Sequence, residues 1–155
     1  MFEYLKKLNK KKKINFDYIE KILEMDSIKN LKMSSNEKVY AILLRQSDIV
    51  KNSFEPIIAY EFGSGDENRI FNETFIPENV PSINNMFETN AIVIIHNHPK
   101  VNDKIIKAYP SKDDILSTIQ VGEYWQSEGC FLLDHIIVNE KDHYSFVENN
   151  LINIF

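Results

Sequence analysis

The chain has 155 residues, of which 43% are hydrophobic and 26% charged, values typical of one soluble globular domain. This length is too short for a (β/α)8 barrel, and the single cysteine, Cys130, excludes an internal disulfide and a zinc finger. No apolar run approaches the ~20 residues of a membrane span, and the start MFEYLKKLNKKKK carries no apolar core behind its charges. We therefore expect a reduced, cytoplasmic protein without membrane contact.

Charge is spread unevenly along the chain. Six lysines and one glutamate give residues 1–13 a charge of +5, which leaves −10 on the other 142 residues because the whole chain carries −5. Nucleic-acid binding requires a basic face, so only the Lys6–Lys13 run could contact nucleic acid or another acidic partner. We expect that run to be a solvated terminus. Residues 1–33 are predicted to form a basic segment and an amphipathic helix, and residues 34–155 the main domain.

The first half of the chain predicts one helix and two strands. Residues 14–30 have the apolar spacing of an amphipathic helix. The residues that share its inner face are Ile19, Ile22 and Leu23. The nearly continuous apolar run at 38–46 predicts a strand that is buried on both faces. A second strand is expected at 55–62, as hairpin partner or near neighbour of the first, followed by a turn at 63–66.

The second half alternates helices and strands. A short helix is expected to start at 81–87, before a strand at 91–99, a helix at 111–125, a strand at 131–139 and a last short strand within 140–146. The apolar residues expected to face inward are Ile83, Met86 and Phe87 in the first of these helices and Ile115, Leu116, Ile119 and Trp125 in the second. This order predicts an α/β (α+β) sandwich in which helices flank a mixed β-sheet.

Two histidines lie at the carboxyl end of the predicted strand 91–99. His96 and His98 are two positions apart and therefore project from the same face of a strand. Both imidazoles can converge on one metal ion at about 2.0–2.1 Å. Taken alone, this spacing fits two exposed or hydrogen-bonded histidines more often than a metal site, so the pattern leaves both interpretations open.

Two acidic residues are further candidates. Ser111 and Asp114 have the spacing of a helix capping box, yet Asp114 could instead be a third metal ligand in the first helical turn. Glu37, at the head of the strand 38–46, is either a surface charge at a strand end or a general base beside the metal. Spacing alone favours the cap and the surface charge.

Several separate segments, taken in order, resemble a known family. IIHNHP, then PSKDDI, then LLDHIIVNEKDHYSF are similar to the JAB/MPN+ (JAMM) zinc metallopeptidase domain, and specifically to its RadC-like bacterial branch. The similarity runs from about Ser34 to Phe146 and is dense from residue 91 onward. The resemblance implies the JAB/MPN, cytidine-deaminase-like architecture for residues 34–155.

The resemblance also implies roles for individual residues. The implied ligands of one Zn²⁺ per chain are His96, His98 and Asp114. Glu37 falls on the position of the catalytic glutamate, and Ser111 on that of the serine that stabilises the tetrahedral intermediate. Asp113 competes with Asp114 as a ligand, and the family pattern favours Asp114. The implied activity is hydrolysis of an amide bond by a metal-activated water, with a peptide or ubiquitin-like protein as substrate.

Two other functions stay open at this point. One is a catalytically silent interaction module on the same fold, and the other, less favoured, is a RadC-like protein associated with DNA repair. Only 33 residues precede the domain, fewer than the helical region typical of RadC-like chains, so we expect the DNA-repair link to transfer poorly. Twelve residues, Pro99 through Pro110, separate His98 from Ser111, a longer connection than the family pattern. This loop could select a substrate, cover the site or merely be tolerated.

Asp134 and His135 belong to the segment LLDHII. Adjacent strand residues face opposite sides of a sheet, so both cannot point at one site. Either one could orient a metal ligand, but a packed core or edge position is the favoured expectation. Cys130 is expected to be a small core residue rather than a nucleophile, and His143 a solvent-exposed turn residue.

Overall fold

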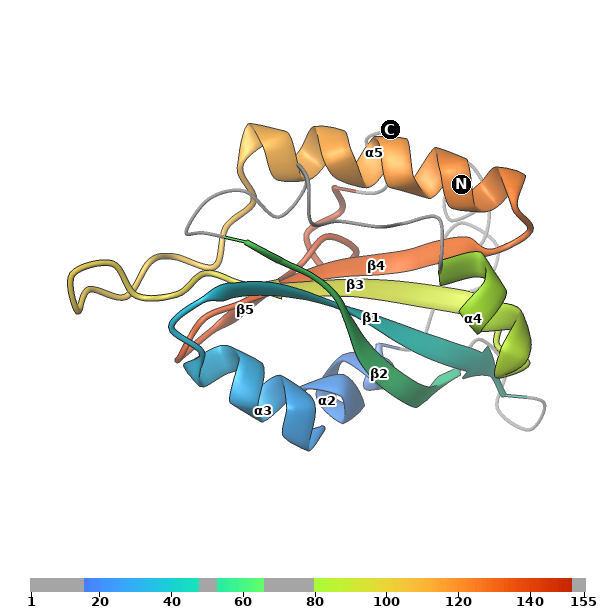
Figure 1. Ribbon diagram of the computed structural model, residues 1–155, viewed down its shortest axis with the longest axis horizontal. Helices are drawn as coiled ribbons and strands as arrows, with labels where there is room; N and C mark the ends of the chain where they lie inside the picture. The colour runs from blue at the N-terminus through green and yellow to red at the C-terminus, as the bar shows by residue number, and fades with distance from the viewer. Residues whose placement is uncertain (1–15, 48–52, 66–79, 152–155) are drawn as a thin grey trace.

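The computed structural model describes residues 16–47, 53–65 and 80–151. A five-stranded sheet, in the order β2-β1-β3-β4-β5, forms the centre of the described part. Helix α5 covers one face of the sheet, α2 and α3 cover the other, and α4 lies at the end of the sheet where β3 begins (Figure 1). The elements are α2 (Asp17–Leu23), α3 (Asp26–Met33), β1 (Glu37–Gln46), β2 (Phe54–Gly65), α4 (Val80–Met86), β3 (Ala91–Asn97), α5 (Lys112–Ser127), β4 (Phe131–Val138) and β5 (His143–Ser145).

The sheet is mixed, as the sequence predicts. Strand β1 pairs antiparallel with both β2 and β3, and β4 pairs antiparallel with β5. Only β3 and β4 run parallel among the described strands, and α5 supplies the crossover that a parallel pair requires. The unit β3-α5-β4 therefore fixes which ends of these three elements meet.

The core lies on both sides of the central strands. All seven residues of β3 are buried, as are Ala41 to Leu44 in the middle of β1, because helices cover both faces. Each buried leucine or isoleucine stabilises the fold by about 1.5–3 kcal/mol relative to an exposed one. Trp125, expected to face inward, is fully buried in α5. Cys130 is buried in the same core, as predicted.

The single helix expected at 14–30 is wrong, because the structure divides it into α2 and α3. Met25 adopts an extended conformation between them, with φ −64° and ψ 136°. With 3.6 residues per turn, the buried Ile22 of α2 and the buried Ile28 and Leu31 of α3 would lie on roughly opposite sides of one straight helix. The break lets both groups pack on the same face of the sheet.

The turn expected at 63–66 is also wrong over the residues that the structure describes. Strand β2 continues to Gly65, which pairs with Glu37. Val39 pairs with Gly63 and Tyr40 with Glu61, so β2 holds one extra residue and forms a β-bulge there. Glycines are common at bulges, and pairing with β1 prevails over their turn preference.

The inward faces of two helices differ from the prediction at one residue each. Met86 in α4 is 76% exposed and Leu116 in α5 is 55% exposed. In α4 the inward positions are Val80, Pro81 and Asn84, and in α5 they include Thr118 and Trp125. Polar Asn84 and Thr118 thus occupy sites that a purely apolar pattern does not reveal.

The structure describes only part of the N-terminal segment predicted at residues 1–33. The Lys6–Lys13 run lies outside the described residues, and the division at residue 34 stays a prediction. The helices that precede β1 share one apolar cluster with the sheet. Within the described ranges, every helix is too short or too polar to cross a membrane.

Candidate metal centre

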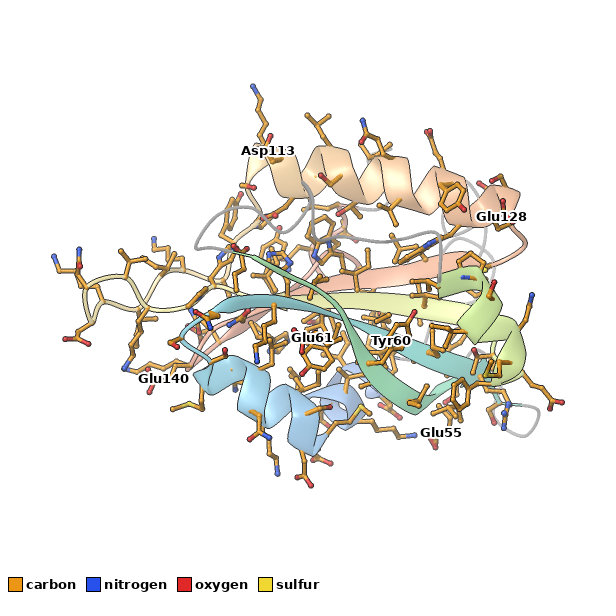
Figure 2. The ribbon with its side chains drawn as sticks, viewed as in Figure 1. Glu55, Tyr60, Glu61, Asp113, Glu128 and Glu140 are labelled. Atoms are coloured by element: carbon orange, nitrogen blue, oxygen red, sulfur yellow. The ribbon has the colours of Figure 1, made fainter. Side chains whose placement is uncertain are left out.

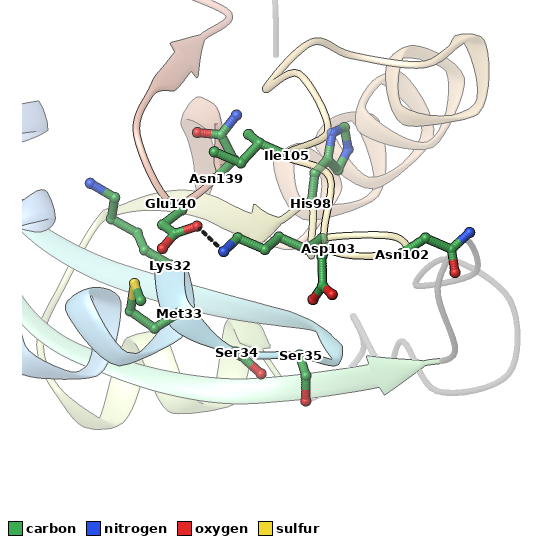
Figure 3. Close-up of a pocket in the computed structure, with 11 residues that line it drawn as sticks. Lys32, Met33, Ser34, Ser35, His98, Asn102, Asp103, Ile105, Asn139 and Glu140 are labelled. Atoms are coloured by element: carbon green, nitrogen blue, oxygen red, sulfur yellow. Dashed lines mark ion pairs between the residues drawn. The ribbon is translucent and has the colours of Figure 1, made fainter.

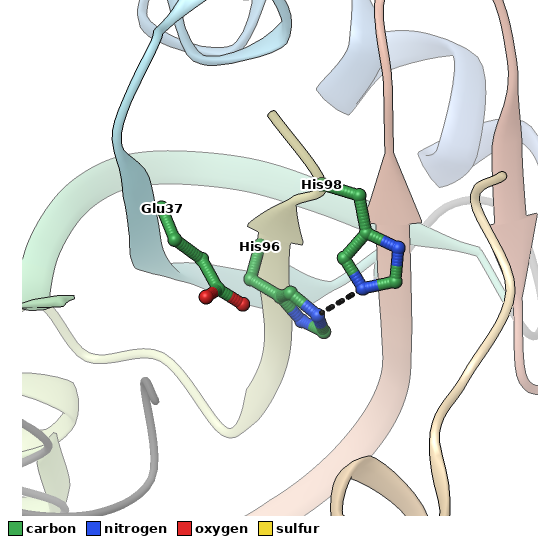
Figure 4. A group of neighbouring side chains, drawn as sticks. All are labelled: Glu37, His96 and His98. Atoms are coloured by element: carbon green, nitrogen blue, oxygen red, sulfur yellow. Dashed lines mark hydrogen bonds between the residues drawn. The ribbon is translucent and has the colours of Figure 1, made fainter. Parts of the chain in front are cut away.

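Three predicted site residues meet at the end of the sheet where β3 stops. One ligand atom from each of Glu37, His96 and His98 lies within 4.8 Å of the others. Figure 4 shows the three side chains side by side. The pairing of Val39 with His96 places these side chains on one face, because residues two apart on a strand point the same way. Glu37 and His96 are buried, and the side chain of His98 is 18% exposed.

Asp114 reaches the same cluster from the first turn of α5. Its Oδ1 lies 3.6 Å from Nε2 of His96 and its Oδ2 lies 3.8 Å from Nε2 of His98. Asp114 also completes a capping box, since its Oδ2 accepts a hydrogen bond of 2.8 Å from the backbone N–H of Ser111. The cap and the approach to the histidines therefore coexist. Asp113 is exposed on the outer side of the helix (Figure 2).

Ser111 lies at the rim of the cluster as the N-cap of α5. Its Oγ accepts a hydrogen bond of 3.0 Å from the backbone N–H of Asp114. The residue is exposed, so its hydroxyl hydrogen is accessible to a bound molecule. Its expected part in stabilising an oxyanion stays a prediction.

The two imidazoles are oriented by contacts at their Nδ1 atoms. Nδ1 of His98 lies 2.8 Å from the carbonyl oxygen of Lys107, and Nδ1 of His96 lies 2.7 Å from Nε2 of His135. The two Nε2 atoms consequently face each other at 3.3 Å. Two nitrogen ligands of a tetrahedral Zn²⁺, each bound at about 2.0–2.1 Å, lie about 3.3 Å apart. The two imidazoles therefore fit zinc in both chemistry and spacing, and the carboxylates of Glu37 and Asp114 both lie near enough to complete the donor set.

Burial and charge act differently on the three groups. Burial lowers the pKa of His96 to about 4, although the Asp114 carboxylate opposes this effect. Burial also disfavours charge on His98, but contacts with Asp114 and the Lys107 carbonyl and the nearby charge of Glu37 outweigh it and raise its pKa. For Asp114, burial is outweighed by contacts with the histidines and with the Ser111 N–H, so its pKa lies well below the usual range. The cluster thus favours a neutral His96 beside an ionised Asp114 carboxylate.

Asn97 ties the two strands of the site together from the opposite face of β3. Its Oδ1 accepts a hydrogen bond of 2.8 Å from the backbone N–H of Lys38, and its Nδ2 donates one of 2.9 Å to the carbonyl of Asn36. These two contacts flank Glu37 in the sequence and fix the start of β1 beside His96 and His98. Sequence reasoning did not single out Asn97.

Thr118 and His135 lie directly behind His96. Sequence reasoning missed Thr118, although its position one helical turn after Asp114 places the two on the same side of α5. His135 is fully buried, stacks on Phe146 at a centroid distance of 4.7 Å, and contacts His96. Core packing and a contact with a candidate ligand, the two alternatives weighed for His135, are thus combined.

Asp134 points to the other side of the sheet, as the alternation of strand residues predicts. Its carboxylate accepts a hydrogen bond of 2.9 Å from the hydroxyl of Tyr18 in α2. A second bond, of 2.5 Å, comes from the hydroxyl of Ser145 in β5. It belongs to the core beneath α2 and not to the metal centre. His143 is exposed, as predicted, but it begins strand β5 and does not lie in a turn, and its Nε2 lies 3.1 Å from Glu148.

The long connection after His98 is an ordered hairpin beside the site. Val101 and Lys104 exchange two backbone hydrogen bonds of 3.0 Å, and Asn102 and Asp103 between them have positive φ angles of 51° and 60°. Such a two-residue turn favours asparagine and aspartate because they tolerate the left-handed conformation. The hairpin projects away from the sheet, toward the left in Figure 1.

A pocket of about 360 Å³ opens between the hairpin and the end of α3. His98 lines it, so the pocket and the metal cluster share a side chain (Figure 3). An ion pair of 2.7 Å joins Lys100 of the hairpin to Glu140, and Asn139 donates a hydrogen bond of 2.8 Å to the carbonyl of Ile106. These contacts fasten the connection to the end of β4.

Comparison with known proteins identifies the same segments. Residues 76–151 match the model of the RadC-like JAB domain. A UPF0758 protein from Fusobacterium nucleatum is 30% identical over 116 residues, which are 75% of this chain and 44% of that protein. UPF0758 proteins from Streptococcus suis and Staphylococcus carnosus are 42% and 40% identical over 60 and 62 residues, which are 39% and 40% of this chain.

The mixed sheet, together with the histidine pair that ends β3 and the Ser-x-x-Asp that begins α5, defines a JAB-type domain. Within that class, residues 76–151 of the chain belong to the RadC-like JAB family. The aligned segments span 44% of the Fusobacterium relative and 22% and 25% of the Streptococcus and Staphylococcus relatives. The names of these relatives specify no substrate or reaction.

Proposed function

We propose that the chain is a zinc-dependent hydrolase that cleaves a peptide or isopeptide bond, with His96, His98 and Asp114 as the ligands of one Zn²⁺. The observation that carries this proposal is the convergence of the two Nε2 atoms, 3.3 Å apart, on the Asp114 carboxylate at 3.6 and 3.8 Å. Zinc held there would supply a Lewis acid that activates water and polarises the scissile carbonyl.

The remaining roles follow from where the other side chains lie. The Glu37 carboxylate, buried beside His96 and His98, takes the proton of the attacking water and passes it to the leaving amine. The Ser111 hydroxyl, which is exposed at the rim, donates a hydrogen bond to the developing oxyanion. Asn97 keeps Glu37 in place by binding the backbone on both sides of it.

A peptide or a ubiquitin-like tail suits the surroundings of the cluster as substrate. The pocket that shares His98 is lined by apolar Met33 and Ile105 as well as by polar groups, so it can accept a side chain near the scissile bond. The hairpin after His98 bounds this pocket and is proposed to influence which chains enter. We propose a cytoplasmic setting, in keeping with the single buried cysteine.

The metal is tested first, on tag-free protein supplied with zinc and analysed by mass spectrometry. We expect about one zinc per chain, and loss of it in His98→Ala and in Asp114→Asn, which removes the charge but keeps an oxygen for the capping contact. His143→Ala and Asp113→Ala are matched controls, since both change exposed residues outside the cluster, and they should retain zinc. A folded wild-type protein that takes up no zinc would refute the proposal.

Catalysis is tested on the zinc-loaded protein with a peptide library and with ubiquitin-like conjugates. Glu37→Gln should retain zinc and lose cleavage by a factor of about 100 or more, because the amide cannot accept the proton. Cleavage that survives unchanged in Glu37→Gln would contradict the assigned base. Zinc binding without cleavage of any substrate would favour the interaction module over the enzyme.

A further inference from the structure

A chain of buried hydrogen bonds runs behind His96 and joins three elements. Nδ1 of His96 in β3 lies 2.7 Å from Nε2 of His135 in β4, and Nδ1 of His135 lies 2.6 Å from Oγ1 of Thr118 in α5. Oγ1 of Thr118 in turn lies 2.5 Å from the backbone carbonyl of Asp114. His96, His135 and Thr118 are each 0% exposed. These hydrogen bonds therefore start at one candidate ligand, His96, and end on the backbone of another, Asp114.

The direction of every proton in this chain follows from the single hydrogen of the Thr118 hydroxyl. The Asp114 carbonyl can only accept, so the hydroxyl must donate to it, as threonine often does to the residue four positions before it in a helix. The hydroxyl can then only accept from His135, whose proton must lie on Nδ1. Nε2 of His135 is thereby an acceptor, and it takes the proton on Nδ1 of His96.

This assignment determines what His96 offers to the site. With its proton on Nδ1, the neutral ring presents the lone pair of Nε2 toward Asp114 and His98. The opposite tautomer would present an N–H group there and could not bind a metal ion. His98 is set in the same way by a different group, since its Nδ1 donates to the Lys107 carbonyl.

We propose that Thr118 and His135 are positioning residues that fix the tautomer and orientation of His96, so that its Nε2 is preset for a divalent metal ion. The proposal rests on the metal site proposed above. Neither residue touches the metal or the substrate. Their effect reaches the site through the His96 ring and, for Thr118, also through its hydrogen bond to the backbone of Asp114. An orienting partner of this kind typically changes metal affinity by about 10- to 100-fold.

Zinc affinity of the full chain, measured by competition with a chromophoric chelator, tests the proposal in one way. Thr118→Val removes the hydroxyl and keeps the shape, so we expect zinc to bind about 10- to 100-fold more weakly. Thr118→Ser restores the hydroxyl and should bind zinc within about threefold of the wild type. Phe146→Leu is the matched control, because it removes the ring stacked on His135 and leaves the hydrogen bonds in place. It should lower the unfolding midpoint without weakening zinc binding.

The tautomer itself is read from the metal-free protein by nitrogen NMR of ¹⁵N-histidine-labelled chains, at a pH at which the imidazoles are neutral. His96 in the wild type and in Thr118→Ser should carry its proton on Nδ1. In Thr118→Val the two nitrogens should become more alike, as expected for a mixture of tautomers. Because this measurement needs no metal, it tests whether the hydrogen bonds from Thr118 and His135 fix the His96 tautomer even if zinc does not bind.

Two results would overturn the proposal. One is a His96 proton on Nε2 in the metal-free wild type, and the other is a folded Thr118→Val protein with wild-type zinc affinity and an unchanged His96 spectrum. A wild type that shows the expected tautomer but binds no zinc would instead refute the proposed function and leave the hydrogen-bond chain as a structural device.

Discussion

Asp134 is a buried carboxylate on the face of the sheet opposite the metal centre, and asparagine in its place should change how stability depends on pH. Its Oδ1 accepts hydrogen bonds from the backbone N–H groups of His135 and Val147, at 2.8 and 3.1 Å. Its Oδ2 accepts from the hydroxyls of Tyr18 and Ser145. Asparagine can keep all four contacts, since its oxygen meets the two N–H groups and its NH₂ meets two hydroxyls that can rotate to accept.

The magnitude follows from the pKa of this carboxyl. Burial raises the pKa of Asp134 from its ordinary value of 3.8 to about 7, although the four hydrogen bonds oppose the shift. Between these values the folded chain holds a proton that the unfolded chain has lost. The free energy of unfolding therefore falls as pH rises through that window, by about 1.4 kcal/mol for each pH unit. Asp134→Asn carries no such proton and should not show this fall.

Chemical unfolding in urea, followed by the fluorescence of Trp125, the only tryptophan, measures the effect at pH 4.5 and pH 8. We expect the difference between Asp134→Asn and the wild type to change by about 3 kcal/mol in favour of the variant over this interval. Asp134→Ala should lose about 3 kcal/mol or more at both pH values, because it leaves buried donors without an acceptor. Parallel stability curves for wild type and Asp134→Asn would refute the argument from burial.

Three further changes test other contacts. Gly129 lies just after α5 with φ +83°, and a Cβ placed there meets none of the described atoms within 4 Å. Gly129→Ala should therefore lower the free energy of unfolding in urea by about 1 kcal/mol, from backbone strain alone. A loss above about 3 kcal/mol would instead indicate a steric clash. Asn139→Ala removes the hydrogen bond to the Ile106 carbonyl, next to the Lys107 carbonyl that contacts His98. It should weaken zinc binding several-fold in chelator competition. Unchanged affinity would show that this segment keeps its position without Asn139. Asn97→Ala should lower kcat about tenfold or more while zinc content stays at one per chain, because the backbone on both sides of Glu37 loses its hydrogen bonds to Asn97. An unchanged kcat would show that Asn97 does not contribute to catalysis.

The strands of this fold could be predicted from the sequence because burial on two faces leaves a plain signal. The run Ala91–Ile95 is apolar at every position, and only a strand covered by helices on both sides needs that pattern. The break between α2 and α3 was missed because the apolar residues before Met25 already satisfy one amphipathic helix. Ile28 and Leu31 are out of phase with that helix, so the signal was present but required the two groups to be compared.

The turn expected at 63–66 failed for a different reason. Gly63, Ser64 and Gly65 have strong local turn preference, but β1 offers them backbone hydrogen-bond partners across the sheet. Pairing between segments far apart in sequence overrides a local preference of this size. No feature of residues 63–66 alone reports which partner strand lies beside them.

The candidate metal centre likewise contains some features that the local sequence indicates and others that depend on residues far apart in the sequence. That His96 and His98 lie on one face could be predicted because their spacing on one strand is local. The cap at Asp114 was equally local, whereas its approach to the two histidines was implied only by the family resemblance. The contact between Thr118 and His135 joins a helix to the next strand across 17 positions. It depends on how far α5 is rotated over β4, which the helical pattern of α5 specifies only loosely.

The unit β3-α5-β4 explains why the long connection after His98 does not disturb the site. Pairing of β3 with β4 fixes where β3 ends, and packing of α5 on β4 fixes where α5 begins, so the distance between His98 and Asp114 does not depend on the length of chain that joins them. The added residues form the hairpin around Asn102 and Asp103, beyond the sheet, and the segment that follows brings the Lys107 carbonyl back to His98. A longer loop therefore changes the surface beside the candidate metal centre while His96, His98 and Asp114 stay together.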